Sequence, residues 1–201
     1  YDGAGNLIRH VDPRGPLFAT TSEFDALNHP VSIITIAGTP AARSPQFESY
    51  EYDAVGNATR YVDARGEAYA TRITYDAQNN RDSVTYAAGT DDQPKSLTEF
   101  WRFDAEGHAV EHQGMGGVNF VTRSTFDGLG RNTSVTNAVS QTSATVYDRF
   151  NNTVAATNFH SGTTTFSFDS LDRMLTAQAP GATRATTYRY DTAGIARDIT
   201  D

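Results

Sequence analysis

The chain has 201 residues, of which 38% are hydrophobic and 20% are charged, and its formal net charge is −8. This length suits one ordinary domain or a short repeat array. No run of about eighteen apolar residues is present, which excludes a membrane-spanning helix. The absence of cysteine excludes disulfides, thiolate zinc sites and cysteine nucleophiles. Because the basic residues are scattered and outnumbered by acidic ones, no nucleic-acid groove is expected.

An aromatic residue followed by aspartate occurs nine times. These pairs begin at Tyr1, Phe24, Tyr52, Tyr75, Phe103, Phe126, Tyr147, Phe168 and Tyr190, at intervals of 23, 28, 23, 28, 23, 21, 21 and 22 residues. Such a period is typical of repeat proteins. The first two units form a pair that recurs, since Asp12-Pro13-Arg14-Gly15 returns as Asp63-Ala64-Arg65-Gly66. We therefore expect residues 1–201 to form a single repeat array.

The residue four positions after each aromatic is always Gly, Asn or Asp. These residues are Gly5, Asn28, Gly56, Asn79, Gly107, Gly130, Asn151, Asp172 and Gly194. Because these types enter the left-handed region at least cost, the pattern predicts positive φ at all nine positions. With aspartate at the first corner, it also predicts a type I turn followed by a G1 bulge, which closes a β-hairpin.

The nine aspartates that follow the aromatics are expected to cap backbone N–H groups in Asx-turns rather than to bind metal. They are Asp2, Asp25, Asp53, Asp76, Asp104, Asp127, Asp148, Asp169 and Asp191. Aliphatic residues are scarce in this chain. The aromatics of the repeat, such as Tyr52, are therefore expected to carry much of the packing.

A second turn is predicted fourteen residues after each aromatic. Its positions are Gly15, Gly38, Gly66, Gly89, Gly117, Ser140, Ser161, and Ala182 with Gly181 beside it. Extra loops are expected at Pro40 to Pro45 and Asp91 to Ser96. Each unit then holds two strands, as at Asn6 to Val11 and Thr71 to Tyr75, and period-2 aromatic pairs agree with this. The predicted fold is all-β, with about eighteen antiparallel strands in hairpins.

The unit aromatic-Asp-x-x-Gly-Asn/Arg, followed by Asp-Pro-Arg-Gly, resembles the YD repeat of the Rhs proteins, the B and C components of Tc toxins and the teneurins. The resemblance covers essentially the whole chain, and nine copies keep one pattern. It implies a spiral sheet that closes into a hollow shell, which in the bacterial toxins encloses a C-terminal toxic domain. It further implies a secreted or cell-surface bacterial protein whose partners are further YD repeats and an encapsulated toxin domain.

The size of the predicted sheet bears on this resemblance. Eighteen strands at roughly 4.8 Å spacing make a sheet about 86 Å wide, which is expected to curl. A sheet closed into one ring would have a diameter of about 27 Å. A 100-residue toxin domain with a radius of gyration of about 13 Å needs a lumen about 34 Å in diameter. We therefore expect a segment of a longer wall, or a module that completes itself by association. No basic or apolar leader opens the sequence, so no signal peptide is expected within it.

Two short motifs suggest chemistry. The run His108-Ala109-Val110-Glu111-His112 spells the H-x-x-E-H of an inverted zinc protease, which requires a helix. In the repeat register this run follows the Gly107 turn, so a strand is expected instead. Asp12-Pro13 raises the possibility of autoproteolysis, but the matching Asp63-Ala64 favours a turn. No catalytic, cofactor-binding or metal site is expected.

The preferred function is therefore structural: a non-catalytic wall segment of a YD-repeat shell. The alternative is an extracellular adhesion or glycan-binding module, in which Trp101 with Phe103, or Tyr188 with Tyr190, would stack on sugars. The same pairs also suit cross-strand packing. The structural role is assigned to the motif residues Tyr1, Asp2, Gly5, Tyr52, Asp53, Gly56, Tyr75, Asp76, Phe103, Asp104, Gly107, Phe126, Asp127, Gly130, Tyr147, Asp148, Phe168, Asp169, Tyr190, Asp191 and Gly194.

Overall fold

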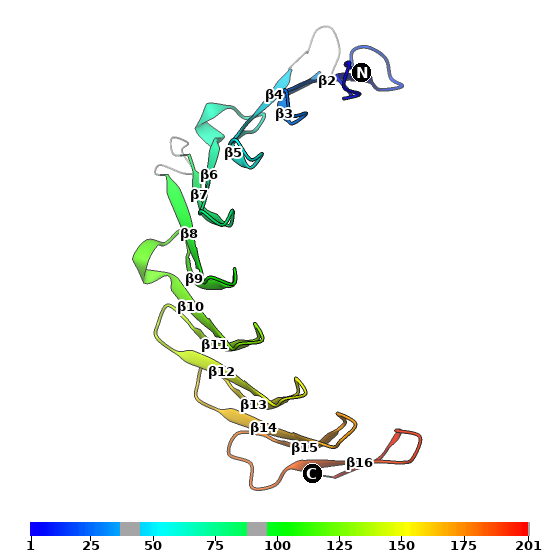
Figure 1. Cartoon of the computed structure of the whole chain (residues 1–201), viewed down its shortest axis with the longest axis vertical. Helices are drawn as coiled ribbons and strands as arrows, with labels where there is room; N and C mark the ends of the chain where they lie inside the picture. Colours follow the sequence, from blue (N-terminus) through cyan, green and yellow to red (C-terminus); the bar gives the residue numbers. More distant parts are fainter. Residues whose placement is uncertain (37–44, 88–95, 201) are drawn as a thin grey trace. The chain divides into compact units, whose positions relative to one another are not determined.

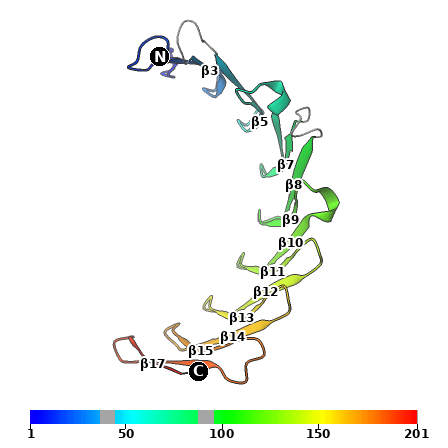
Figure 2. The same ribbon diagram turned by 180° about the vertical axis from the view of Figure 1, so that it is seen from behind.

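The computed structural model describes residues 1–36, 45–87 and 96–200 as a succession of β-hairpins (Figure 1; Figure 2 gives the view from behind). The chain divides into two compact units, Tyr1–Trp101 and Arg102–Asp201. The predicted turn glycines Gly38 and Gly89, and nearly all of the two predicted longer loops, lie outside the described residues.

The first unit contains β1 to β7 and most of β8, and each strand pairs antiparallel with the next one in the chain. The strands are β1 Arg9–Val11, β2 Ala19–Phe24, β3 Pro30–Ile36, β4 Gln46–Tyr52, β5 Ala58–Val62, β6 Thr71–Tyr75, β7 Arg81–Tyr86 and β8 Leu97–Phe103. A single 3-10 turn, η1 (Glu67–Tyr69), lies between β5 and β6.

The second unit continues the same pattern of neighbouring antiparallel pairs. Its strands are β9 Ala109–Gln113, β10 Val121–Phe126, β11 Asn132–Thr136, β12 Thr142–Tyr147, β13 Thr153–Thr157, β14 Thr163–Phe168, β15 Met174–Gln178, β16 Thr186–Tyr190 and β17 Ala196–Thr200, with the 3-10 turn η2 (Gly117–Asn119) between β9 and β10. The predicted all-β hairpin fold is confirmed, with seventeen strands in the described residues. Neither of the two described helical turns is long enough to cross a membrane.

The aspartate turns have the predicted geometry. In each, the aspartate N–H bonds the carbonyl four residues on, and the left-handed residue donates back to the aspartate carbonyl, as between Asp53, Asn57 and Gly56. The register shifts by one residue just before the aromatic, so that Tyr52 pairs with Ala58. All nine predicted positions have positive φ, from 58° to 94°. The predicted hairpin closure is therefore confirmed.

The second reversals also contain left-handed residues. Among the predicted positions, φ is positive at Gly15, Gly66, Gly117, Ser140, Ser161 and Gly181. In the eighth repeat, which begins at Phe168, the left-handed residue is thus Gly181 and not its neighbour Ala182. In two of these reversals Asn137 and Asn158 replace the aspartate as the cap, since each side-chain oxygen accepts two backbone N–H groups.

One predicted strand begins later than expected. The segment Asn6 to Val11 becomes regular only at Arg9, where β1 begins. The physical reason is that Asn6 belongs to the preceding turn, where its backbone N–H and its side-chain amide both bond the Asp2 carboxylate. The strand predicted at Thr71 to Tyr75 is confirmed as β6.

Little of the molecule is buried. The buried hydrophobic side chains of the described residues are Ala19, Val62, Ala70 and Val84, and no large side chain is fully buried. Eight of the nine repeat aromatics are half-buried, whereas Tyr1 is 81% exposed. The aromatics thus pack against their neighbours without forming a closed core, because each hairpin contacts mainly the hairpins beside it.

Hydroxyl pairs brace the strands next to the asparagine turns. Thr136 and Thr142 lie 2.9 Å apart at their Oγ1 atoms, and Thr157 and Thr163 lie 2.8 Å apart. Cross-strand threonine bonds of this kind stabilise antiparallel pairs. They explain part of the high threonine content of these strands.

We expect Gly56→Val to lower the free energy of unfolding by about 1–2 kcal/mol or more. Gly56 has φ +94, and a Cβ there would lie 3.1 Å from the ring of His29. The matched control is Gly128→Val, at a position with no positive φ and nothing within 4 Å of the added Cβ. Urea unfolding measures both changes, and equal losses in the two variants would contradict the left-handed requirement.

Candidate functional site

Within each of the two compact units, the aspartate turns lie in a row at one end of the strands, and we call this row the turn edge. Because the strands pair in chain order, successive aspartate turns lie next to one another there, and the second reversals lie at the opposite ends of the strands (Figure 1). The turn edge concentrates most of the motif residues that the sequence singles out. It is therefore the candidate functional surface.

One carboxylate oxygen of each turn aspartate organises its turn. Asp53 Oδ1 accepts the backbone N–H groups of Val55 at 3.0 Å and Asn57 at 2.9 Å. The same two bonds occur in all nine turns. The aspartates therefore act as the predicted backbone caps.

The other carboxylate oxygen bonds a side chain at the position that the repeat pattern gives as Asn or Arg, for which the sequence analysis predicted no role. This is the closing residue, five positions after the aromatic: Asn6, His29, Asn57, Asn80, His108, Arg131, Asn152, Arg173 or Ile195. The first eight of these bond the Oδ2 atom of their turn aspartate. Ile195 has no group that can do so. The repeated Asn, His and Arg at this position were the signal available in the sequence.

These bonds favour the ionised carboxylate. The side-chain amide of Asn57, followed by its backbone N–H, lowers the pKa of Asp53. The Arg131 side chain is likewise the main cause of the lowered pKa of Asp127, to which its guanidinium is paired at 2.6 Å. The turn edge is thus a row of ionised, internally bonded carboxylates.

The closing residues also reach the next hairpin. At three of the four closing asparagines, the amide donates to the left-handed Asn or Asp of the following turn. Asn6 Nδ2 lies 2.8 Å from Asn28 Oδ1, and Asn152 Nδ2 lies 2.9 Å from Asp172 Oδ1. Asn57 makes the same bond to Asn79. Each of these bonds couples neighbouring turns side by side.

When the closing residue is histidine, its ring instead stacks on the next aromatic. The ring centroids of His29 and Tyr52 are 4.7 Å apart, and those of His108 and Phe126 are 4.6 Å apart. Each imidazole also lies over the following left-handed glycine, where a Cβ would come within 3.1 Å at Gly56 and within 2.8 Å at Gly130. Glycine therefore provides the space that the ring needs.

Arginine combines both modes. The guanidinium of Arg131 lies 4.5 Å above the Tyr147 ring, and its Nη1 also donates to the carbonyl of Asp148 at 3.0 Å. The guanidinium of Arg173 lies 4.7 Å from the centre of the Tyr190 ring. Cation–π contacts of this kind brace one hairpin against the next.

Tyrosine hydroxyls form a second connection between neighbouring hairpins. Tyr52 donates to the carbonyl of Pro30 at 2.9 Å, Tyr75 to Ala58 at 3.1 Å, and Tyr190 to Met174 at 2.8 Å. Each acceptor is six residues after the preceding aromatic. The choice of Tyr rather than Phe at these positions therefore has a structural consequence.

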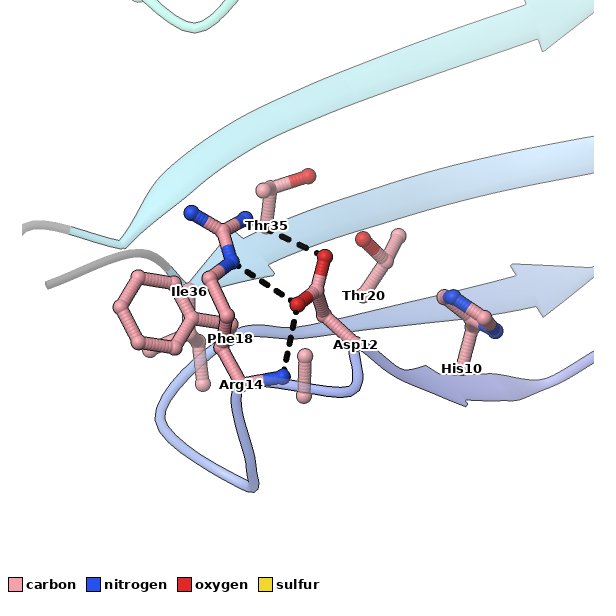
Figure 3. A pocket seen from close by; sticks show the side chains of 8 residues that line it. His10, Asp12, Arg14, Phe18, Thr20, Thr35 and Ile36 are labelled. Carbon is pink, nitrogen blue, oxygen red and sulfur yellow. Dashed lines mark hydrogen bonds and ion pairs between the residues drawn. The ribbon is translucent and has the colours of Figure 1, made fainter.

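At the other end of the strands, the two reversals that begin at Asp12 and Asp63 have the same arrangement. Arg14 bonds the Asp12 carboxylate at 2.8 Å and lies 4.2 Å from the centre of the Phe18 ring, as Figure 3 shows beside a shallow pocket. Arg65 repeats this arrangement with Asp63 and with the Tyr69 ring at 4.0 Å. The Arg14 side chain lowers the pKa of Asp12 to about 2. Asp12-Pro13 thus lies in a turn, as expected.

The H-x-x-E-H run is not arranged as a protease site. Residues 109–113 form strand β9, so the run has no helical pitch. His108 is held by Asp104 at 3.0 Å, and Glu111 pairs with Arg123 at 2.9 Å. The strand predicted from the repeat register is confirmed.

We expect Tyr52→Phe to cost about 0.5–1.5 kcal/mol, since it removes the bond to Pro30 and leaves that carbonyl without its partner. Tyr52→Ala should cost more, about 1.5–3 kcal/mol, because the half-buried ring and its contact with His29 are lost as well. Tyr1→Phe is the control at an 81% exposed ring. Chemical denaturation measures these losses, and a Tyr52→Phe protein as stable as the Tyr1→Phe protein would contradict the bracing role.

We further expect the chain to lose stability in acid. Turn aspartates such as Asp53 have a folded pKa below the ordinary value of 3.8, so their contribution is complete above that value and is lost as the pH falls through the folded pKa. For Asp12 this window extends down to a pH of about 2. Asp53→Asn keeps a cap oxygen, as at Asn137, but removes one titration. The free energy of unfolding, measured between pH 7 and about pH 2, should therefore fall less steeply in acid for this variant. An unchanged dependence of this free energy on pH would contradict the assignment.

Comparison with known proteins gives a consistent result at the level of the fold. No protein-family model matches the sequence, and no curated protein matches it. The chain is similar to the crystal structure of TcdB2-TccC3 without its hypervariable C-terminal region, with a TM-score of 0.63 and 15% identity over 98% of this chain and 11% of that one. It is also similar to TcdB2-TccC3-TEV, with a TM-score of 0.61 and 15% identity over 94% and 10% of the two chains.

A third similar structure is the Tc holotoxin pore of Photorhabdus luminescens, with a TM-score of 0.62 and 16% identity over 94% of this chain and 10% of that one. The chain therefore spans about a tenth of the length of these proteins. At such identities the likeness shows the fold alone. This chain has the YD/Rhs-type repeat fold that its sequence pattern predicts.

Proposed function

We propose that this chain is a non-catalytic wall segment of a larger YD-repeat shell that encloses a toxin or effector domain. The observation that carries the proposal is the bonding at the turn edge. There the ionisable motif residues are engaged in capping their own turn or in bracing the next hairpin. Residues bonded in this way stabilise the wall, and their polar groups are not available to form an active site around a substrate.

The comparisons support the same proposal. The similar structures are Tc toxin complexes, one of them described as lacking a hypervariable C-terminal region. Because this chain spans about a tenth of those proteins, enclosure would require many more repeats. We infer that its partners are further YD repeats, from the same parent chain or from another copy, and a secreted bacterial protein is the setting that this role implies.

The adhesion alternative is less well supported. Sugar stacking needs an accessible aromatic face. The guanidinium of Arg81 lies 4.9 Å from the centre of the Trp101 ring, and Arg173 lies over the Tyr190 ring at 4.7 Å. One member of each proposed stacking pair, Trp101 or Tyr190, thus already has an arginine against its ring. A glycan screen against this chain, with Trp101→Ala as its comparison, should give no Trp101-dependent binding.

The wall function is tested in the parent protein that contains this sequence. We expect an enclosed domain to resist limited proteolysis until the turn edge is weakened by Arg131→Ala, Asn152→Ala and Arg173→Ala together. The control replaces the exposed side chains of Leu129 and Leu171 with alanine, since both lie at tips of the same turns. Protection should be lost in the first protein and kept in the second.

Two results would contradict the proposal. One is a parent protein in which no domain is protected before the substitutions are made. The other is hydrolase activity that Glu111→Gln abolishes, because Glu111 is assigned here only to an ion pair with Arg123.

A further inference from the structure

We propose that Asp104, Glu106 and His108 form a binding site for a divalent transition-metal ion of the zinc class. They belong to the first aspartate turn of the second unit. Each offers one ligand atom, and these atoms all lie within 4.8 Å of one another. Two carboxylates and an imidazole are a donor set that zinc accepts.

Two of the three ligands are already placed for one ion. His108 Nδ1 and Asp104 Oδ2 are 3.0 Å apart. Ligand atoms about 2.0–2.2 Å from the same zinc ion lie about 3.0–3.5 Å from each other. An ion can therefore replace the hydrogen that joins the two atoms, with little movement of either side chain.

Glu106 supplies the adjustable ligand. It is exposed at the tip of the turn, and it is its backbone N–H that bonds Asp104, at 3.1 Å. Its carboxylate is therefore not needed to hold the turn. It can rotate toward the other two ligands without disturbing the cap.

The imidazole is oriented by its neighbours. Its ring stacks on Phe126 with centroids 4.6 Å apart and planes 18° apart. Its Nε2 atom faces Gly130, where a Cβ would lie only 2.8 Å away. These contacts fix the direction of Nδ1, and ligand orientation of this kind favours metal binding.

The surroundings suit a cation. The three ligands line a hollow together with Phe126, Asp127 and Gly130, which leaves space for an ion and its water molecules. The carboxylate of Asp127 is compensated by Arg131, whereas Asp104 and Glu106 add two negative charges. An imidazole ligand favours zinc over calcium or magnesium, which take oxygen ligands. If Nδ1 carries the proton, that proton goes to solvent on binding.

The His29 turn in the first unit is a natural comparison. His29 Nδ1 also lies 3.0 Å from its turn aspartate, Asp25, and its ring also stacks on the next aromatic. The residue that corresponds to Glu106 is Leu27, which is exposed and cannot ligate a metal. The two turns thus differ in the third ligand, and this difference makes the proposal testable within one chain.

The test is calorimetric titration of residues 1–201 with zinc chloride in a buffer that does not chelate metal. We expect one zinc ion per chain. Glu106→Gln should weaken zinc binding about tenfold or more, since even the loss of a residue that only hydrogen-bonds a metal ligand lowers the affinity about tenfold. His108→Asn should abolish the site while keeping the cap, because asparagine closes four other turns.

A gain-of-site variant completes the experiment. Leu27→Glu should add a second zinc equivalent, because it recreates the ligand set in the His29 turn. Circular dichroism checks that each variant keeps its strand content. Zinc binding that is absent from the unaltered chain, or that is unchanged in both Glu106→Gln and His108→Asn, would overturn the proposal, as would a Leu27→Glu protein without a second equivalent.

Discussion

The structure depends on one interaction, the bonding of the turn aspartate carboxylate. Its first oxygen accepts two backbone N–H groups and so sets the left-handed closure of the hairpin, as at Asp53. Its second oxygen holds the closing residue, as Asp127 holds Arg131. The polar group that bonds this oxygen also contacts the neighbouring turn, as when Asn152 bonds both Asp148 and Asp172. Local turn chemistry thereby becomes the contact between successive repeats.

This arrangement compensates for the small hydrophobic core. Only small or β-branched residues such as Ala19 and Val84 are buried among the described hydrophobic residues. Stability is therefore distributed over half-buried aromatics, hydroxyl bridges such as Tyr52 to Pro30, and closing residues. Each contact joins a hairpin to its neighbour, as expected for a repeat protein whose stability is a sum of units and interfaces. A substitution at the turn edge consequently affects two hairpins.

The proposed function follows from how these polar groups are used. Groups that serve as ligands or bases in an enzyme are here bonded to their own turn or to the next one. The Asp104 turn departs from this pattern, because Glu106 adds a carboxylate that the turn does not need. A structural repeat can acquire a binding site in this way by changing one exposed residue, while its cap and its stacking contact stay in place.

The sequence by itself determined the nine turns, their left-handed residues, the all-β fold and the second reversals that lie within the described residues. It could do so because each turn is specified within about six residues by the steric preference of Gly, Asn and Asp and by an aspartate cap. It placed the start of β1 too early, since Asn6 is held by Asp2.

The tertiary structure alone decided which closing residue meets which partner. The sequence treats Gly56 and Asn79 as equivalent turn residues, yet one leaves room for the His29 ring and the other accepts a bond from Asn57. Those partners lie more than twenty residues apart. The register of the sheet brings them together. The local preferences of each turn do not predict which side chains of two neighbouring hairpins come into contact.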